Sequence, residues 1–349
     1  MIRVVVAEDS LTVRELMVSI LESDPEIRVL GQAKNGVEAV ELTVRLRPDL
    51  ITMDVHMPVM DGFEATKEIM VHAPTPILIV SSSASGREVE LSLNAMRAGA
   101  LMVLPKPDDP QSARFDERRR ELVAMAKAMA QVKVVRRWGP RLAPVAPAPL
   151  RRAPRSPARL IAVAVSTGGP TALQQILSEL PGDFPVPILA VQHIATGFVG
   201  GLATWLDGAC SLRVKVAEHG EPLAKRTVFL AADDRHLGVS GDGRVALADA
   251  PPLGGFRPSG TYLFESVARA YGAAGAAVIL TGMGSDGVQG LRAVKAAGGQ
   301  VVAQDEATSV VYGMPREAAM AGLVDDVLPL GTVAARLVEL VAAPGQSAR

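Results

Sequence analysis

The stretch AVAVSTGGPTAL, residues 162–173, decides how the second half of this chain folds. A run of small apolar residues ends at Ser166, two glycines and a proline follow, and a helical pattern then begins. This order of strand, glycine turn and helix is typical of an α/β domain with a parallel sheet. Ser166 would then follow a buried strand, where it either caps the next helix or acts as a nucleophile.

Alternating strand and helix patterns fill two regions of the chain, which predicts two α/β domains. In the first, residues 1–130, five short apolar runs alternate with amphipathic stretches and predict a five-stranded parallel sheet. In the second, residues 159–345, the pattern predicts a doubly wound, mostly parallel sheet with a small hairpin within residues 213–249. The expected strands are 3–8, 28–33, 49–54, 76–81, 101–105, 160–165, 187–192, 213–218, 227–232, 244–249, 276–282 and 300–305.

A linker, residues 131–158, is expected between the two domains. Residues 139–159 hold six prolines and five arginines and almost no large apolar residue. Such a segment cannot form a packed core, so it is interpreted as a semi-extended, positively charged spacer. The alternative is a basic docking site for an acidic partner.

Composition excludes several classes of function. With 349 residues and a net charge of −1, the chain lacks the basic excess of a protein that binds nucleic acid or membrane surfaces by bulk charge. Its one cysteine, Cys210, excludes an internal disulfide and favours a reducing compartment. The beginning of the chain has no long apolar segment, and no run is long enough to span a bilayer. We therefore expect a cytoplasmic protein with no direct membrane insertion.

Polar residues end the predicted strands of the first domain. Glu8 and Asp9 end the first strand, Asp54 the third and Ser81 the fourth, while Lys106 follows the fifth. Because the carboxyl ends of parallel strands meet at one edge of a sheet, these side chains should converge. Clustered carboxylates repel one another and favour a divalent cation such as Mg²⁺. Such a pocket suits transfer of a phosphoryl group to one carboxylate.

These residues resemble the receiver domain of two-component response regulators. The resemblance covers about the first 125 residues and rests on the motifs AEDS, DVHMPVMDG (54–62), VSS (80–82) and PKP (105–107). It implies a flavodoxin-like fold in which Asp54 accepts the phosphoryl group and Lys106 pairs with it. It also implies that Ser81 hydrogen-bonds the phosphoryl group, with Ser82 as the open alternative. The implied Mg²⁺ ligands are Glu8, Asp9, Asp54 and the backbone carbonyl of His56.

This sequence departs from the usual receiver pattern at two positions. Glu8 stands where many receivers have aspartate, and its longer side chain is expected to reach the cation through a water. His56 stands where glutamate is frequent, with little expected effect because its backbone carbonyl would be the ligand.

In the second domain, Ser166 needs a base and an oxyanion site to act as a nucleophile. His193 also ends a strand, so it is preferred as the base over His219 and His236. Asp286 lies in a third strand-end loop, ILTGMGSDGVQGL, and is preferred as the acid over Asp233, Asp234 and Asp305. Backbone N–H groups near Thr167, Gly168 and Met283 would form the oxyanion site.

Other interpretations of these residues remain open. The STGGP segment would merely begin a helix, and TGMGSDG would bind a phosphate or nucleotide without covalent chemistry. Cys210 is a less favoured nucleophile because no histidine neighbours it in sequence. The absence of GxSxG and the chain order Ser, His, Asp argue against the α/β-hydrolases.

The second domain resembles the catalytic domain of the chemotaxis protein-glutamate methylesterases. The motifs that carry the resemblance are STGGP (166–170), QH (192–193), FRPSG (256–260), ILTGMGSDG (279–287) and QDEATSVVYGMP (304–315). The resemblance implies that Ser166 attacks a glutamate methyl ester on a chemoreceptor and releases methanol, with no cofactor for the ester reaction. His193 would be the base and then the acid, and Asp286 would orient it. The residues implied to shape the cleft are Phe256, Arg257, Pro258, Ser259 and 313–315.

The two resemblances together imply a phosphorylation-activated enzyme in chemotactic adaptation. Methyl-accepting chemoreceptors would be the substrate, a chemotaxis histidine kinase the phosphoryl donor, and some relatives also deamidate glutamines. The protein is expected to be a monomer that does not bind nucleic acid. The alternatives are a receptor-binding signalling module without catalysis, and a receiver-controlled esterase in a pathway other than chemotaxis.

Overall fold

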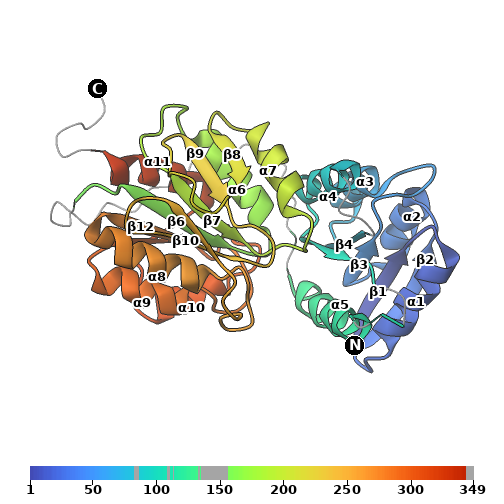
Figure 1. The fold of residues 1–349 in the computed structure, drawn as a ribbon. Coiled ribbons are helices and arrows are strands. Elements are labelled where there is room, and N and C mark those ends of the chain that lie inside the picture. The colour runs from blue at the N-terminus through green and yellow to red at the C-terminus, as the bar shows by residue number, and fades with distance from the viewer. Residues whose placement is uncertain (82–85, 108–110, 113, 133, 135–155, 343–349) are drawn as a thin grey trace.

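The computed structural model describes residues 1–81, 86–107, 111, 112, 114–132, 134 and 156–342. Most of the predicted linker and Ser82 lie outside these residues. The described chain forms two α/β sheets, each covered by helices on both faces, as the alternating pattern predicts (Figure 1). No helix in the described ranges has the length and apolar character needed to cross a membrane.

The first sheet contains five parallel strands in the order β2-β1-β3-β4-β5. Helices α1 and α5 cover one face, and α2, α3 and α4 lie on the other. The order reverses between β1 and β3, which is where open α/β sheets bind ligands. The elements are β1 (Ile2–Ala7), α1 (Leu11–Glu22), β2 (Ile27–Ala33), α2 (Gly36–Leu46), β3 (Leu50–Met53), α3 (Gly62–His72), β4 (Ile77–Ser81), α4 (Gly86–Ala98), β5 (Met102–Pro105) and α5 (Phe115–Met129).

The second sheet contains seven parallel strands in the order β14-β13-β12-β6-β7-β9-β8. The chain runs outward from β6 through β7, then returns to add β12 on the other side of β6. Its first elements are β6 (Leu160–Val165), α6 (Gly169–Glu179), β7 (Ile188–Gln192), α7 (Val199–Asp207), β8 (Arg213–Val216), β9 (Thr227–Leu230), β10 (His236–Val239) and β11 (Val245–Ala248). The remainder are α8 (Gly260–Tyr271), the short 3-10 helix η1 (Gly272–Ala274), β12 (Gly275–Ile279), α9 (Val288–Ala296), β13 (Gln300–Gln304), α10 (Met314–Met320), β14 (Asp326–Leu328) and α11 (Leu330–Val341).

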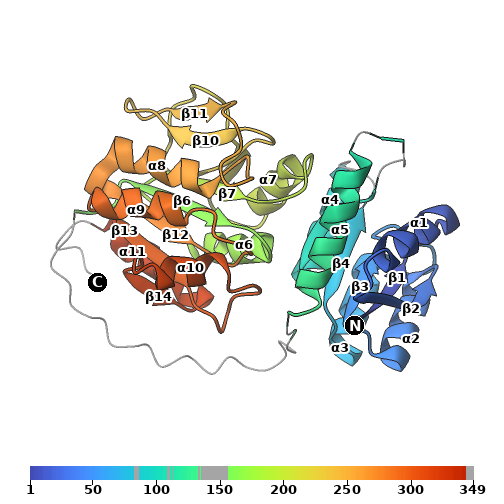
Figure 2. The ribbon, with the colours of Figure 1, turned by 90° about the horizontal axis from the view of Figure 1, so that it is seen from below.

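The predicted hairpin is confirmed, but it is smaller than the strand cluster that predicted it. Among the named strands of the described residues, β10 and β11 alone pair antiparallel, and they form a separate two-stranded sheet over α8 (Figure 2). Strands β8 and β9, in the first part of the same range, join the edge of the main sheet. Their apolar residues pack in the main core, which is the physical reason for this division.

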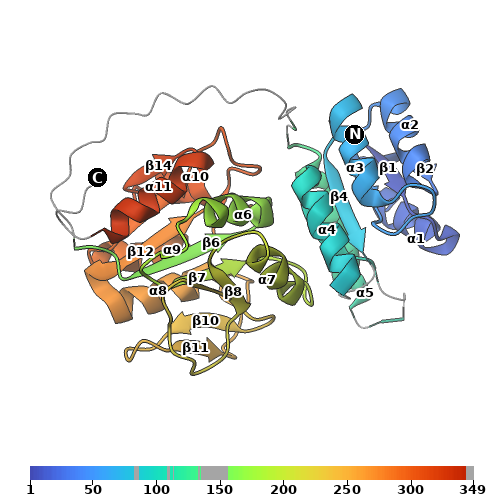
Figure 3. The ribbon, with the colours of Figure 1, turned by 90° about the horizontal axis from the view of Figure 1, so that it is seen from above.

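The two sheets are joined by packing between helices. Helix α4 of the first domain lies against α6 and α7 of the second (Figure 3). Its Val89 and Met96 belong to a buried apolar cluster that continues into the second domain. Polar contacts accompany this packing: Trp205 Nε1 donates to Asn94 Oδ1 at 3.4 Å, and Thr171 Oγ1 donates to the Met96 carbonyl at 3.4 Å. The carboxyl ends of the strands of the second sheet therefore face the first domain.

Candidate active site and phosphorylation pocket

Ser166, His193 and Asp286 lie together at the carboxyl edge of the second sheet. Ser166 directly follows β6, His193 directly follows β7, and Asp286 lies in the loop after β12. Strand β6 pairs with both of the other strands, so the register of the sheet brings the three loops to one place. The structure thus places the three side chains where the sequence predicted them.

Asp286 is held in a cage of hydrogen-bond donors at the beginning of helix α8. Its carboxylate accepts from Ser259 Oγ at 2.7 Å and from three backbone amides, those of Gly260 at 2.6 Å, Thr261 at 3.1 Å and Gly287 at 2.9 Å. Burial raises the pKa of Asp286, but the bonds from His193, Ser259 and Gly260 outweigh burial and lower it to about 2. The positive end of the helix dipole favours the same ionised form. Asp286 is therefore a carboxylate that only accepts hydrogen bonds at neutral pH.

The imidazole of His193 is oriented by Asp286 and by an aromatic ring. His193 Nε2 lies 2.9 Å from Asp286 Oδ2, and the imidazole stacks on Phe256 with centroids 4.4 Å apart and planes 10° from parallel. Because Asp286 is ionised, Nε2 must carry the proton of the neutral ring. Nδ1 then holds the lone pair, and this atom is buried with no hydrogen-bond partner among the described residues. The imidazole therefore has one nitrogen, Nδ1, whose lone pair can accept a proton.

Ser166 and His193 line the same cleft, which has a volume of about 550 Å³. Ser166 is 8% exposed, and within the described chain no hydrogen bond joins its hydroxyl to the imidazole. The space beside Ser166 depends on Gly282, where a Cβ would lie 2.7 Å from Ser166 Cβ. The geometry thus brings the Ser166 hydroxyl and the His193 imidazole to one cavity without a direct hydrogen bond between them.

The turn after Ser166 supplies backbone N–H groups at the same cleft. Gly168 has a φ of 76°, and a Cβ there would lie 2.5 Å from Val310 Cγ2, so both backbone conformation and space favour glycine. The N–H groups of Thr167 and Met283 have no partner among the residues that the structure describes, and both residues line the cleft. The Gly168 N–H donates to the carbonyl of Leu101, in the first domain, at 3.2 Å.

The first domain forms the opposite wall of this cleft. Its contributions come from strand β5, from helix α5 and from the residue that precedes α5, and they are Met102, Val103, Leu104, Arg114, Glu117, Arg118, Glu121 and Met125. The cleft is thus bounded by the catalytic sheet on one side and by the first domain on the other. The active-site edge of the second sheet is covered in this state.

The other predicted cleft residues lie around Asp286 and Met283. Ser259 holds Asp286, while Arg257 pairs with Asp234 at 2.7 Å and follows Phe256, which lines the cleft. Pro258 joins this segment to Arg257 through a cis peptide bond. Within 313–315, Gly313 N and Met314 N donate to the Gly282 carbonyl, so this turn supports the Met283 loop and Met314 itself is buried in the core.

The histidines and acids not preferred from sequence have other partners. His219 Nδ1 accepts from Leu247 N, and His236 stacks on Tyr262 and lies 3.1 Å from the Pro251 carbonyl. Their roles are structural rather than catalytic.

Asp233 accepts from Gly197 N, and Asp305 accepts from Thr308. Cys210 is half-buried, burial raises the pKa of its thiol, and its Sγ donates to the Leu212 carbonyl. Asp234, paired with Arg257, lines the cleft but has no bond to His193 among the described residues.

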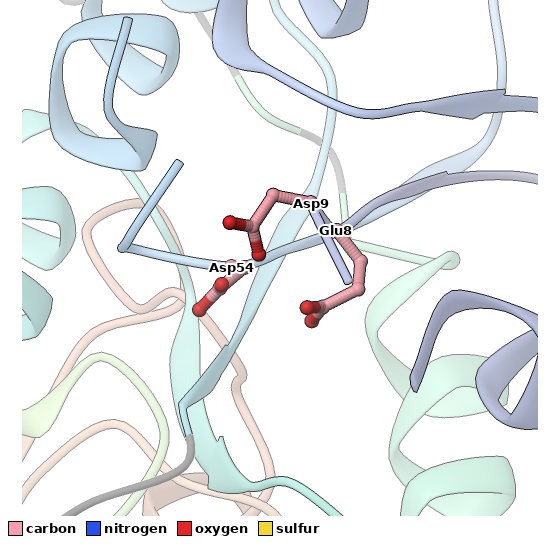
Figure 4. A group of neighbouring side chains, drawn as sticks. All are labelled: Glu8, Asp9 and Asp54. Carbon is pink, nitrogen blue, oxygen red and sulfur yellow. The ribbon is translucent and has the colours of Figure 1, made fainter. Parts of the chain in front are cut away.

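Three carboxylates converge at the carboxyl edge of the first sheet, as predicted. One oxygen from each of Glu8, Asp9 and Asp54 lies within 4.8 Å of the others (Figure 4). Lys106 Nζ bridges two of them, 2.7 Å from Glu8 and 2.9 Å from Asp54. Hard carboxylate oxygens at this spacing fit a divalent cation.

Burial determines the electrostatics of this pocket. It raises the pKa of both Glu8 and Asp54 in spite of their bonds to Lys106. Burial also opposes the charge on Lys106, but the two carboxylates outweigh it and raise the pKa of Lys106. One ammonium thus faces the carboxyl groups of Glu8 and Asp54 and offsets only one negative charge, so the ionised pocket keeps a net negative charge that favours a cation.

Ser81 and His56 both lie near Glu88 on helix α4. Ser81 Oγ donates to Glu88 Oε2 at 3.3 Å, and His56 Nε2 lies 3.8 Å from Glu88 Oε1. Sequence reasoning missed Glu88, because an acid in the first turn of a helix is common and carries no distinctive signal. It also missed the anchoring role of Ser259, although the residue stood in a quoted motif.

Both halves of the chain match known families. The family model described as "CheB methylesterase" matches residues 161–337, and that described as "Response regulator receiver domain" matches residues 4–114. A protein-glutamate methylesterase/protein-glutamine glutaminase of Myxococcus xanthus is 55% identical over 96% of this chain and 96% of its own length. A relative of the same name from Anaeromyxobacter dehalogenans is 53% identical over 97% of this chain and 98% of its own length.

A solved structure resembles the second domain. The CheB methylesterase catalytic domain of Thermotoga maritima is 40% identical, with a TM-score of 0.52. The match covers 53% of this chain and 99% of that one.

Proposed function

This chain belongs to the family of CheB methylesterases that carry a response regulator receiver domain, and from that premise we propose that it hydrolyses glutamate γ-methyl esters on chemoreceptors. The reaction would serve adaptation in chemotaxis. The observation that carries the chemistry is His193, whose Nε2 is held by Asp286 while its buried Nδ1 has no hydrogen-bond partner in the described part of the chain. We divide the chain into a receiver, residues 1–130, a linker, 131–158, and a catalytic domain, 159–345.

In the first half of the reaction, Ser166 Oγ attacks the ester carbonyl carbon and its proton passes to His193 Nδ1. The imidazolium that forms is stabilised by the ionised Asp286. The oxyanion accepts hydrogen bonds from backbone N–H groups of Thr167 and Met283 and, once the receiver moves away, from Gly168. The intermediate collapses, the C–O bond to the methoxy group breaks, and His193 returns the proton so that methanol leaves.

In the second half of the reaction, a water molecule enters the site that methanol has left and hydrolyses the acyl-serine ester. His193 Nδ1 takes a proton from water as the water oxygen attacks the acyl-serine carbonyl. The bond from the carbonyl carbon to Ser166 Oγ then breaks, and His193 returns the proton to Oγ, which gives glutamate and the free Ser166 hydroxyl. A glutamine side chain passes through the same tetrahedral species and releases ammonia, so glutamine deamidation is proposed as a second activity. The names of the relatives support both activities.

In the receiver, Asp54 is the proposed phosphoryl acceptor. Mg²⁺ is the proposed cation; Glu8, Asp9, Asp54 and the His56 carbonyl would hold it, and it would neutralise charge on the phosphoryl oxygens. Lys106 would leave Glu8 to pair with the phosphoryl group, and Ser81 would leave Glu88 to hydrogen-bond it. A chemotaxis histidine kinase is the proposed donor.

Phosphorylation is proposed to release the receiver from the catalytic cleft. The receiver lines one wall of the cleft and holds the Gly168 N–H through Leu101. A change of about 3 kcal/mol in the docking equilibrium would change activity about a hundredfold. The resting protein is therefore an inhibited esterase, and we propose that it acts as a monomer in the cytoplasm.

The test is methanol release from methylated receptor membranes, with and without acetyl phosphate and Mg²⁺. The wild type should release methanol faster with the donor, while Ser166→Ala should release almost none in either condition. Unchanged signalling in Ser166→Ala would instead indicate a binding module without catalysis. Turnover of aryl esters with no methanol from receptors would indicate an esterase of another pathway.

A further inference from the structure

Two side chains from neighbouring strands hold the carbonyls of the turn that follows the nucleophile. Gln192 Nε2 donates to the Ser166 carbonyl at 2.9 Å, and Thr281 Oγ1 donates to the Thr167 carbonyl at 2.9 Å. Gln192 is the last residue of β7, and Thr281 comes two residues after β12. Neither residue belongs to the proposed Ser, His and Asp set, and both are almost fully buried.

The Gln192 side chain is held both by hydrogen bonds and by the shape of the space around it. Its Nε2 also donates to the His193 carbonyl at 2.8 Å, so one amide joins the backbone beside the nucleophile to the backbone beside the base. A Cβ on Gly169 would lie 2.0 Å from Gln192 Oε1, so that glycine provides the space for the side chain. The Gly169 N–H adds a second bond to the Ser166 carbonyl, at 2.8 Å.

Thr281 is confined in the same manner. Its hydroxyl accepts from Val311 N at 3.0 Å, while its own N–H donates to Gln304 Oε1 at 2.8 Å. The Thr281 carbonyl in turn accepts from Ser166 N at 3.0 Å. The hydroxyl therefore has a fixed position from which to hold the Thr167 carbonyl.

Because a peptide group is planar, the bonds from Gln192 and Thr281 to the two carbonyls also fix the directions of the N–H groups in this turn. In a planar trans peptide the C=O of one residue and the N–H of the next point in opposite directions. Holding the Ser166 carbonyl inward turns the Thr167 N–H outward, and holding the Thr167 carbonyl inward turns the Gly168 N–H outward. The structure bears this out at Gly168, whose N–H meets the Leu101 carbonyl across the domain boundary at 3.2 Å.

We propose that Gln192 and Thr281 are positioning residues for the oxyanion donors of this esterase. They act through two successive peptide planes and present the N–H groups of Thr167 and Gly168 to the oxygen that gains charge. This inference rests on the proposed function. A donor fixed before reaction stabilises the transition state more than the ground state, so its loss lowers kcat rather than raising KM.

The test compares Thr281→Val, which removes the hydroxyl, with Thr281→Ser, which keeps it. A second pair compares Gln192→Met, which removes the amide donor, with Gln192→Asn, which keeps the donor on a shorter arm. Full-length proteins would be activated with acetyl phosphate and Mg²⁺ and assayed for methanol release from methylated receptor membranes. Thr281→Val and Gln192→Met should each lower kcat about tenfold to a hundredfold with KM within twofold of wild type, and Thr281→Ser should recover most of kcat.

A transition-state analogue separates this role from a structural one. A receptor peptide with a trifluoromethyl ketone in place of the methyl ester forms a hemiketal with Ser166 whose oxyanion needs the same donors. Its inhibition constant should rise by the same factor as kcat falls. Wild-type kcat in both Thr281→Val and Gln192→Met would overturn the inference, as would lost activity with an unchanged inhibition constant. If one variant does not fold, the other carries the test.

The same experiment keeps this inference distinct from the proposed function. Methanol release that Ser166→Ala does not abolish would refute the serine mechanism itself. Release that depends on Ser166 but not on Gln192 or Thr281 would refute only the positioning role.

Discussion

Replacing Gly201 by alanine should activate the esterase without phosphorylation. Gly201 lies in helix α7, where the receiver packs against the catalytic domain, and a Cβ there would lie 2.1 Å from Val89 Cγ1 of helix α4. Val89 is buried and β-branched, so it has little freedom to move aside. Such overpacking costs about 1–3 kcal/mol.

This cost falls on the docked state alone, because the clash vanishes when the domains separate. Alanine also favours the helix over glycine by about 0.5–1 kcal/mol, but that gain is the same in both states and cancels. The docking equilibrium should therefore shift about 5-fold to 150-fold toward the open state. Resting activity should rise by that factor until it reaches the activity of the phosphorylated enzyme.

The assay is methanol release from methylated receptor membranes without a phosphoryl donor, with Gly200→Ala as the matched control. A Cβ on Gly200, in the same helix, meets no atom of the described residues within 4 Å. Gly200→Ala should keep the resting rate, and Val89→Ala combined with Gly201→Ala should restore inhibition in part. Equal activation in both glycine variants, or no activation in Gly201→Ala, would refute the steric reasoning.

Three further outcomes follow from the two sites. Lowering the pKa of Asp286 from 3.8 to about 2 stabilises the folded domain by about 2 kcal/mol at pH values above 3.8, and this contribution is lost as the pH falls toward 2. Between pH 6 and pH 2.5, the free energy of unfolding measured in urea should therefore fall less for Asp286→Asn than for wild type. An equal fall in both proteins would contradict the lowered pKa of Asp286. Phe256→Leu removes the ring stacked on His193 and should lower kcat/KM about twofold to tenfold. The ratio of the methanol-release rates without and with acetyl phosphate should stay unchanged. A changed ratio would indicate that Phe256 takes part in the inhibition by the receiver instead. Asp54→Asn should incorporate no phosphoryl group from acetyl phosphate, and EDTA should abolish incorporation in the wild type; labelling that persists in either case would exclude Asp54 or the cation, respectively.

The catalytic constellation was predictable because it depends on a simple rule of parallel sheets. Ser166, His193 and Asp286 each follow a strong apolar run, and the carboxyl ends of such strands share one edge. What the pattern could not give was the orientation of the ring. His193 turns Nε2 toward Asp286, and the amides at the beginning of α8 hold that carboxylate through contacts between residues far apart in sequence.

The strands and the helix that the sequence analysis did not predict have weak secondary-structure patterns in their local sequence. Strand β14 has only three residues, and β10 contains a histidine and a glycine that dilute its strand propensity. Helix α7 contains Gly200 and Gly201, which lower helix propensity by about 1 kcal/mol each. Gly201 is explained only by the neighbouring receiver, and a single sequence does not show which surfaces of two domains meet.

Strand β5 directly connects the cleft of the second domain to the acidic pocket of the first domain. The carbonyl of Leu101, immediately before it, accepts from Gly168 N in the turn after Ser166, and Lys106, immediately after it, pairs with Glu8 and Asp54. Both ends are pinned to β4 by the bonds Leu101 N to Ile77 O and Lys106 N to Ser81 O. An extended segment of this length spans about 17 Å. Selection for mutants whose esterase activity no longer depends on phosphorylation should therefore return substitutions in 102–105, a segment remote in sequence from Ser166, His193 and Asp286.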